Sequence, residues 1–574
     1  MRILDGPNVH LPRPAIQVRL QVDAFMEAGE TTFAVWVRDA GGPPNLLAAV
    51  ANADQAAVAV AVGPPRSTTR AAAVADLVRY VAVRLAKRGG VRNLKVVLAP
   101  GWESGELIVA FPWRRLTPAE RLARYIAYVL EDLGTSKLSS TLARVTERLN
   151  TSPAGERAWV PEPHVPTVGI TGTNGKTTTT RMIGNLLVAA GRRAAWNSTD
   201  GVYVDGRLVE AGDWAGFGGA GRVLETPSLD VAVLEIARGG ILRRGIGVRH
   251  LDVAVVTNVT ADHLGELGIH DLEDLARAKA AIVAIVRPGG WVVLNAEDPR
   301  VLAMRERTHA NVCAFSLDPA ATGLAEVVAG GGRALTVSDG WLVLRDGSAG
   351  PQAVVAHVPI VAISEVPATL GGISRHNLAN AMGATGALLA LGVEAEQVAV
   401  GLRAFVPDAD VNPGRLNLWA LDGRTVLVDV AHNEDSLDAM LDVARRLVPE
   451  GARMHALTGS IGDRPDHVIV RLGELSVQRA DVVAFAQKER FLRGRDPAEL
   501  VELLQHGAKR AGRDEPVPVH DDELVGLAAM LDRTEPGDVV AFAVHAHLGD
   551  VNDWLRARGA TMARVDELPG RHPA

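Results

Sequence analysis

The segment between residues 168 and 178 has the composition of a loop that binds phosphate groups. It reads Val168-Gly169-Ile170-Thr171-Gly172-Thr173-Asn174-Gly175-Lys176-Thr177-Thr178. Glycines allow backbone N–H groups to close around a triphosphate, and the positive end of the following helix faces the same anion. The Lys176 ammonium can reach the outer phosphates, and the Thr177 hydroxyl can hold Mg²⁺. Although Ile170 replaces a glycine of the general motif, the segment predicts ATP binding through Gly172, Thr173, Asn174, Gly175, Lys176, Thr177 and Thr178.

Further polar residues follow short apolar runs downstream of this loop. Glu235 lies at the end of one run, and Asn258 follows another and leads into Asp262 and His263. Lys279 lies 16 residues beyond His263, on a helix predicted over 272–286. Ligands of open α/β sheets bind at the carboxyl ends of the strands, so we expect these side chains to share one site. Three later clusters have the same character: Arg375-His376-Asn377, Asn412-Pro-Gly-Arg415 and Asp429-Val-Ala-His432-Asn433.

The elements that must position these residues fall into three predicted domains of an α/β protein. Residues 1–150 mix strand patterns, at 16–22 and 58–62, with helical patterns, and predict an α+β domain of unclear role. Residues 160–408 alternate short β-branched runs with helices, which predicts a P-loop central domain around a parallel sheet. Residues 409–574 continue as a C-terminal, Rossmann-like α/β domain.

Composition narrows the class of protein. The 574 residues are 47% hydrophobic and 22% charged, as in an ordinary globular protein, and the net charge of −7 does not favour nucleic acid as a partner. An apolar run long enough to span a membrane and a signal-peptide layout are both absent, which predicts a cytoplasmic protein without a membrane partner. Cys313 is the only cysteine, so an intramolecular disulfide is excluded. Only seven of the 60 basic residues are lysines, so a lysine within a motif indicates a need for amine chemistry.

The motifs resemble those of the Mur ligase superfamily, the ATP-dependent amide ligases of peptidoglycan and folylpolyglutamate synthesis. Within it they are most similar to the Mur-like half of cyanophycin synthetases, over roughly residues 160–500. The pieces that carry the resemblance are Thr199-Asp-Gly-Val-Tyr203, Glu235-Ile-Ala-Arg-Gly-Gly-Ile-Leu-Arg243, Ala261-Asp-His-Leu-Gly265, Asn412-Pro-Gly-Arg-Leu-Asn417 and Leu492-Arg-Gly-Arg495. Cyanophycin synthetases place an ATP-grasp domain before this half, and the roughly 150 residues ahead of the loop are too few for it.

The resemblance implies roles for single residues. Together with Thr177, Glu235 and His263 would bind magnesium, and Lys279 occupies the position of a carbamylated lysine that acts as a metal ligand. Lys176, Glu235, His263 and Lys279 would therefore be the catalytic group. Asn377, Arg415 and Asp429 match positions that hold the nucleotide base, phosphate and ribose. His432 matches a position near the nucleotide, and a structural role for it is equally compatible with the sequence.

The substrates follow from the same resemblance. We expect an acyl phosphate to form on a carboxylate substrate, small molecule or peptide, and an amino acid amine, with arginine the first to test, to attack it. Arginine forks match carboxylates and phosphates, which makes Arg238, Arg243, Arg493 and Arg495 candidate substrate residues. Glu489 is the candidate partner of a cationic amine substrate.

Two other functions remain open from the sequence. One is a catalytically inactive nucleotide-binding scaffold or subunit, against which the completeness of the motif set argues. The other is a folylpolyglutamate-type ligase, which the Ala237–Arg243 stretch disfavours. We also expect a homo-oligomer, because cyanophycin synthetases assemble.

Overall fold

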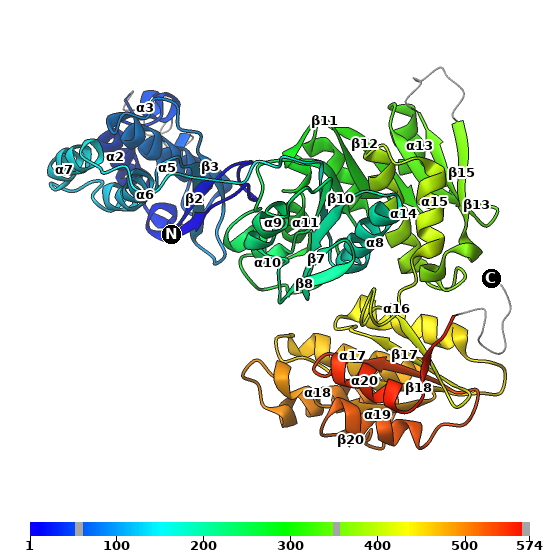
Figure 1. The fold of residues 1–574 in the computed structure, drawn as a ribbon. Coiled ribbons are helices and arrows are strands. Elements are labelled where there is room, and N and C mark those ends of the chain that lie inside the picture. Colours follow the sequence, from blue (N-terminus) through cyan, green and yellow to red (C-terminus); the bar gives the residue numbers. More distant parts are fainter. Residues whose placement is uncertain (52–60, 348–355, 565–574) are drawn as a thin grey trace.

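The computed structural model describes the backbone of residues 1–51, 61–347 and 356–564, which contain three sheets (Figure 1). The first is antiparallel, in the order β1–β2–β4–β3, with bounds Arg2–Leu4, Ala15–Gln21, Glu106–Pro112 and Val97–Pro100. Its helices are α1 (Asp23–Glu27), α2 (Glu30–Ala40), α3 (Pro44–Ala51), α5 (Thr68–Arg88), α6 (Leu116–Glu131) and α7 (Leu138–Asn150). The strand predicted at 16–22 corresponds to β2.

The strand predicted at 58–62 is wrong where the structure describes it. Residues 58–60 lie outside the described residues, whereas Ala61 and Val62 are helical. Alternating alanine and valine fit either period, and alanine is the strongest helix former. Val62 is fully buried in the helical core of this part of the chain.

The second sheet has eleven strands in the order β15–β14–β13–β12–β11–β10–β5–β9–β6–β7–β8. Its middle, from β13 to β6, is parallel, and hairpins extend it at both edges. The bounds are β5 Thr167–Thr171, β6 Ala194–Asn197, β7 Gly201–Val204, β8 Arg207–Ala211, β9 Val231–Glu235, β10 Leu251–Val256, β11 Val286–Asn295, β12 Asn311–Ser316, β13 Arg333–Ser338, β14 Trp341–Asp346 and β15 Ala356–Ala362. β5, β9 and β10 are buried along their whole length, as strands covered on both faces should be.

The helices of this part are α8 (Lys176–Ala189), α9 (Phe217–Leu224), α10 (Arg238–Arg243), α11 (Leu272–Lys279), α12 (Pro299–Ala303), α13 (Thr322–Ala329), α14 (Arg375–Ala390) and α15 (Ala395–Ala404). α8 follows β5 through the glycine-containing loop, and α10 follows β9. The helix predicted over 272–286 ends at Lys279, because the buried β-branched residues Ile282, Val283 and Ile285 lead through the 3₁₀ turn Val283–Ile285 into β11. Lys279 therefore lies at the carboxyl end of α11.

The N-terminal part of the chain docks on this second sheet through its first residues. The Ile246 N–H donates to the Pro7 carbonyl (2.6 Å), and the Asp5 N–H donates to the Arg244 carbonyl (2.7 Å). The Arg2 guanidinium donates to Leu242 O, at the end of α10 (2.8 Å). These contacts thus fix the end of α10, the helix that carries Arg238 and Arg243.

The third sheet has seven strands in the order β20–β19–β18–β21–β17–β16–β22 and is parallel from β20 to β17. Its bounds are β16 Asn417–Leu421, β17 Arg424–Asp429, β18 Met454–Thr458, β19 Val482–Ala486, β20 Val519–His520, β21 Val539–Ala543 and β22 Thr561–Met562. Its helices are α16 (Glu434–Leu447), α17 (Asp466–Arg479), α18 (Pro497–Arg510), α19 (Glu523–Leu531) and α20 (Leu548–Ala557).

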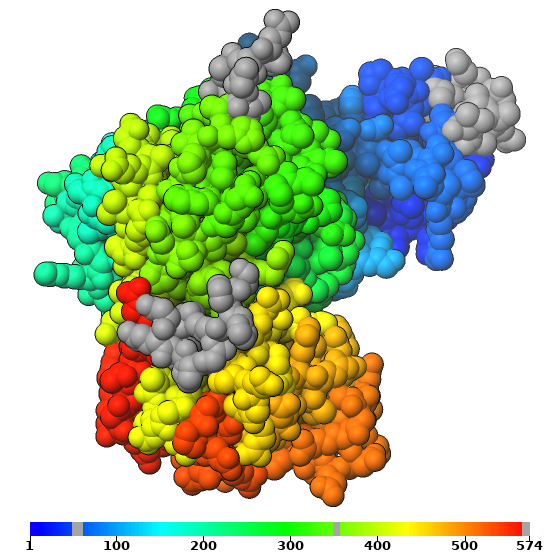
Figure 2. Space-filling view, turned by 90° about the vertical axis from the view of Figure 1, so that its right-hand side faces the viewer, coloured from blue at the N-terminus to red at the C-terminus, as the bar shows by residue number. Residues whose placement is uncertain are grey.

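In the space-filling view this C-terminal part lies directly against the central part, while the N-terminal part lies on another side of the central part (Figure 2). The fold is thus an α/β architecture built on parallel-rich sheets, as the sequence predicts. Within the described ranges, none of the helices has the length and apolarity needed to cross a membrane.

Candidate active site

A cavity of about 860 Å³ lies between the central and C-terminal parts, where the carboxyl ends of β5, β9, β10 and β17 meet. It is lined by most of the residues that the sequence singles out. These are Gly172, Thr173, Asn174, Gly175, Lys176, Thr177, Thr178, Arg238, Arg243, Glu235, His263, Lys279, Asn377, Arg415, Asp429, His432 and Arg493. Glu489 and Arg495 are not among the lining residues. The cavity can therefore hold a nucleotide together with part of a second ligand.

The phosphate loop requires its glycines. Gly175 has a φ of +85°, and a Cβ there would lie 2.2 Å from Asn380 Oδ1. A Cβ on Gly172 would lie 1.8 Å from Thr257 Oγ1. The Lys176 ammonium donates to the carbonyls of Gly172 (3.0 Å) and Thr173 (2.7 Å), so it lies over the mouth of the loop. This arrangement matches a cradle for phosphate oxygens.

Asn258 fixes the loop from the next strand, which the sequence does not reveal. Its side-chain carbonyl accepts the backbone N–H groups of Thr173 (3.2 Å) and Asn174 (2.9 Å), and its amide donates to Asn174 O (3.1 Å). The residue was expected only at the end of a strand, since its partners depend on which strands are neighbours.

Glu235 presents an unpaired oxygen beside the loop. Its Oε1 accepts from the Thr177 hydroxyl (3.2 Å), while Oε2 is buried and has no hydrogen-bond partner in the described part of the chain. Burial raises the pKa of this carboxyl, and the Lys176 ammonium opposes that rise. A buried carboxylate oxygen next to a hydroxyl fits a hard divalent cation such as Mg²⁺. Over the described ranges, no group of three or more His, Cys, Asp or Glu side chains could hold a metal. A cation here would thus need other ligands, such as Thr177 and phosphate oxygens.

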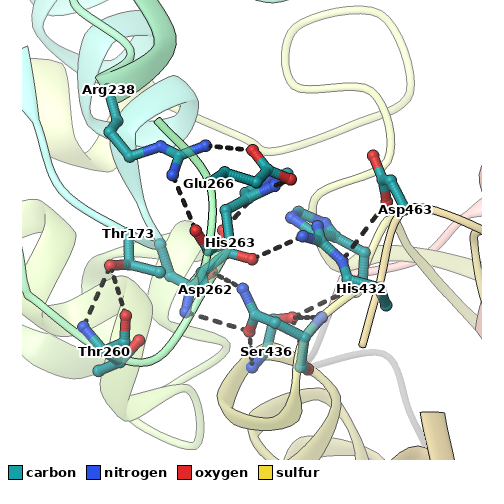
Figure 3. Close-up of polar contacts among 12 residues, drawn as sticks. Thr173, Arg238, Thr260, Asp262, His263, Glu266, His432, Ser436 and Asp463 are labelled. Carbon is teal, nitrogen blue, oxygen red and sulfur yellow. Dashed lines mark hydrogen bonds and ion pairs between the residues drawn. The ribbon is translucent and has the colours of Figure 1, made fainter. Parts of the chain in front are cut away.

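His263 and Arg238 belong to one network (Figure 3). His263 Nδ1 lies 3.1 Å from Glu266 Oε1, and Arg238 donates to Glu266 Oε2 (2.8 Å) and to the His263 carbonyl (2.9 Å). His263 has a φ of +52°, an uncommon backbone conformation for a residue other than glycine. Arg238 therefore fixes the loop that carries His263, and functional sites are where such strain collects.

Lys279 is the most unusual side chain of the site. It is only 3% exposed, and in the described part of the chain its ammonium has neither a hydrogen bond nor an ion pair. Burial and then the nearby charge of Lys176 lower its pKa well below the usual range. A buried amine that is neutral is the form that reacts with carbon dioxide, so the position suits a carbamate.

Asn377, Arg415 and Asp429 occupy the far side of the cavity. Asn377 donates to Ala368 O (3.0 Å) and accepts from Asn380 (3.1 Å), so it is held at the start of α14. The Asp429 carboxylate accepts the Leu416 N–H (2.9 Å), which fixes the turn that carries Arg415. Burial raises the pKa of Asp429 to about 6, and the Arg415 charge opposes that rise.

This pKa shift gives a prediction for stability. Because the folded-state pKa of Asp429 exceeds the usual 3.8, the native state holds the proton more tightly, and stability falls as the pH rises from about 4 to about 6. We expect Asp429→Asn to raise the free energy of unfolding by about 3 kcal/mol above pH ~7 and to change it little near pH ~4. Urea unfolding at the two pH values measures this. An equal effect at both would contradict it.

Two contacts join the C-terminal part to the catalytic loops. The side-chain amides of Asn174 and Asn433 donate to each other's oxygens, at 3.3 and 3.0 Å. Arg464 Nη1 forms an ion pair with Asp262 Oδ1 (2.8 Å), and Asp262 directly precedes His263. Arg464 is 4% exposed, and its guanidinium holds the pKa of Asp262 below its ordinary value against the effect of burial. Sequence reasoning missed Arg464, because an isolated arginine in an arginine-rich chain gives no signal.

We expect the Arg464–Asp262 ion pair to stabilise the folded protein. Arg464→Met leaves the Asp262 carboxylate without its partner, which costs about 3–5 kcal/mol when the surviving charge is buried. Asp262→Asn combined with Arg464→Met should recover most of that loss. A double-mutant cycle in urea unfolding tests the coupling, and additive effects of the two single changes would refute it.

The candidate substrate arginines differ in their surroundings. Arg243 and Arg493 line the cavity, and neither has a hydrogen bond or an ion pair with another described residue, although Arg493 lies 5.5 Å from the centre of the Phe491 ring. Arg495, by contrast, pairs with Asp466 (2.8 Å) and Glu499, and it donates to the Arg464 carbonyl (3.1 Å). Glu489 is exposed on the 3₁₀ turn Glu489–Phe491.

The comparisons with known proteins agree with this geometry. Residues 170–388 match the Mur ligase middle domain, and residues 414–543 match the glutamate ligase domain found at the C-terminus of Mur ligases. The chain belongs to the Mur ligase family. The two matched domains are the ones that contribute the cavity, and together they span more than half of the chain.

Several relatives of this Mur ligase chain are cyanophycin synthetases. That of Synechocystis sp. is 36% identical over 379 residues, which are 66% of this chain and 42% of the relative. The chain therefore spans less than half the length of the cyanophycin synthetases that it matches. A UDP-N-acetylmuramoyl-L-alanyl-D-glutamate–2,6-diaminopimelate ligase of Gloeobacter violaceus is 26% identical over 66% of this chain and 74% of its own length. Escherichia coli FolC in complex with DHPP and ADP aligns with a TM-score of 0.49 and 21% identity over 69% of this chain and 90% of FolC.

Proposed function

We propose that this Mur ligase family protein is an ATP-dependent amide ligase that joins a carboxylate substrate to an amino acid amine. The observation that carries the proposal is one cavity that brings together a phosphate loop, a Glu235 oxygen and the buried Lys279 amine, the last two without a hydrogen-bond partner among the described residues. The likeness to cyanophycin synthetases and Mur ligases supports the same class of reaction.

The first step would form an acyl phosphate. The substrate carboxylate attacks the γ-phosphorus of ATP, a P–O bond forms, and the bond to the β-phosphate oxygen breaks to release ADP. Lys176 neutralises charge on the outer phosphates from its place above the loop. When bound, Mg²⁺ would supply further charge neutralisation, and Thr177 and Glu235, with His263 and a carbamylated Lys279, are the residues proposed to hold it.

The C-terminal part would complete the site around the nucleotide. Arg415 approaches from the turn before β16 and Asp429 from the end of β17, and Asn433 bonds directly to the phosphate loop. This contact excludes water from the acyl phosphate, which would otherwise hydrolyse. We base the substrate proposal on Arg243 and Arg493, because both line the cavity and neither forms a hydrogen bond or an ion pair with another described residue. Guanidinium forks bind carboxylates in pairs of hydrogen bonds, so an acidic acceptor suits them.

Hydroxylamine trapping tests the proposal. A panel of acidic amino acids and acidic dipeptides is incubated with ATP, magnesium and hydroxylamine, and hydroxamate and ADP are measured together. We expect at least one acid to give hydroxamate with an equal amount of ADP. ATP binding without any hydroxamate across the panel would instead favour the inactive scaffold. Amide formation with each amino acid then identifies the amine, with arginine tested first, and light scattering tests the proposed homo-oligomer.

A further inference from the structure

His432 presents a free ring nitrogen to the cavity. Its Nδ1 lies 2.9 Å from the Val430 carbonyl, which can only accept, so Nδ1 carries the ring proton. The other nitrogen, Nε2, is therefore the lone-pair side of a neutral imidazole. His432 lines the cavity, and its neighbour Asn433 bonds to the phosphate loop. His432 therefore lies at the end of the cavity where phosphate groups are expected to bind.

A buried polar cluster positions this ring from behind. Lys488 is 1% exposed, and its ammonium donates to Glu523 Oε1 (2.8 Å), Ala543 O (2.6 Å) and His545 Nδ1 (2.7 Å). Three acceptors use all three N–H groups of the ammonium, so the proton of His545 lies on Nε2. The His545 ring packs edge to face against His432, with centroids 6.1 Å apart and an interplanar angle of 81°.

Glu523 fixes the backbone of the segment that carries His545. This fully buried carboxylate accepts the N–H groups of His545 (2.7 Å), Ala546 (2.8 Å) and His547 (3.0 Å), in addition to the Lys488 ammonium. A buried ion pair is a costly way to stabilise a fold, because both charges lose their hydration. This pair instead fixes the position of the His545 ring, which packs against His432.

Three carboxylates near the phosphate loop already have polar partners. Glu266 is bonded to Arg238 and His263, Asp262 is paired with Arg464, and one Glu235 oxygen is bonded to Thr177. Burial lowers the pKa of His432 to about 4; Asp262 opposes that change, and Arg464 and Arg415 add to it. The His432 imidazole is thus neutral at ordinary pH, and the negative charge of bound phosphate groups would raise its pKa towards the range of a general base.

We propose that His432 Nε2 takes the proton of the incoming ammonium group, with His545, Lys488 and Glu523 as positioning residues. This inference rests on the proposed ligase function. The nitrogen lone pair then adds to the acyl carbon, a C–N bond forms, and the bond from that carbon to the phosphate oxygen breaks with its electron pair leaving on phosphate. Of the two protons that an ammonium loses on becoming an amide N–H, the first goes to His432 and the second leaves with phosphate.

Hydroxylamine distinguishes loss of a proton acceptor from other causes of lost activity. It is already neutral near neutral pH, so it needs no proton acceptor before it attacks the acyl phosphate. His432→Asn keeps a side-chain donor for the Val430 carbonyl and removes Nε2. We expect it to lower amide formation from the amino acid by about 100-fold or more and to leave hydroxamate formation near the wild-type rate. His467→Asn, at an exposed histidine on α17 of the same part of the chain, is the matched control and should change neither rate.

His545→Asn supplies the second test. The asparagine oxygen can still accept from Lys488, while the ring edge that contacts His432 is lost, so a smaller loss of amide formation with unchanged hydroxamate formation is expected. Equal loss of amide and hydroxamate in His432→Asn, or no loss of either, would overturn the assignment. Absence of hydroxamate from the wild-type protein would instead reject the ligase function, and this inference with it.

Discussion

Lys176→Ala is expected to lower ATP-dependent turnover by at least about 10³-fold while leaving the fold intact. The ammonium lies over the mouth of the phosphate loop, held by the carbonyls of Gly172 and Thr173. In the proposed reaction, this preorganised donor would stabilise the charge that develops on the transferred phosphoryl group. Loss of one such donor in a dry site costs about 10²–10³-fold even when the donor is neutral. A full positive charge should cost more.

The measurement is ADP release under saturating acid, together with binding of a fluorescent ATP analogue. Lys509→Ala is the matched control, because Lys509 is an exposed lysine at the end of α18, remote from the cavity lining. Retention of more than a few per cent of wild-type turnover in Lys176→Ala would show that the loop does not act on the transferred phosphate.

The sequence could predict the centre of the site because its residues are tied to strand ends. Thr171, Glu235 and Val256 end three buried strands that are neighbours in the central sheet. Parallel neighbours bring their carboxyl ends to one edge, so polar residues just beyond them must meet. The β-branched runs that mark these strands are visible without a structure, which is why the phosphate loop, Glu235 and His263 were expected at one place.

Residues whose position depends on the packing of two domains could not be predicted in this way. Arg464 reaches Asp262 only because the C-terminal part docks over the phosphate loop. The Lys488–Glu523 pair joins the end of β19 to the start of α19, 35 residues apart. Lys488 did carry one usable signal, since it is one of only seven lysines in the chain. The end of α11 at Lys279 was missed for a local reason: the alanine-rich sequence beyond it has a helical pattern, and the strand that follows overrides it.

Loss of Lys279, or of the carbon dioxide that we expect to modify it, is the second change with a large expected effect on activity. The buried Lys279 amine, whose pKa burial lowers, has no hydrogen-bond or ion-pair partner among the described residues, so the unmodified amine contributes no polar contact to the fold. We expect it to react with carbon dioxide and form a carbamate, which converts an amine into an anion that binds metal. Removal of bicarbonate from the buffer should then lower the activity of the wild-type protein, and its addition should restore that activity.

Lys279→Ala is expected to lower turnover by about 10²-fold or more and to be rescued in part by short carboxylic acids such as formate, because these can place a carboxylate in the space left by the side chain. Lys87→Ala, which alters a lysine at the end of α5 in the N-terminal part, should show normal activity and no response to formate. Carbon-13 bicarbonate gives a direct readout, since a carbamate resonance should be present in the wild-type protein and absent from Lys279→Ala. Full activity of the wild-type protein without bicarbonate, combined with no carbamate resonance, would leave Lys279 with only a structural role.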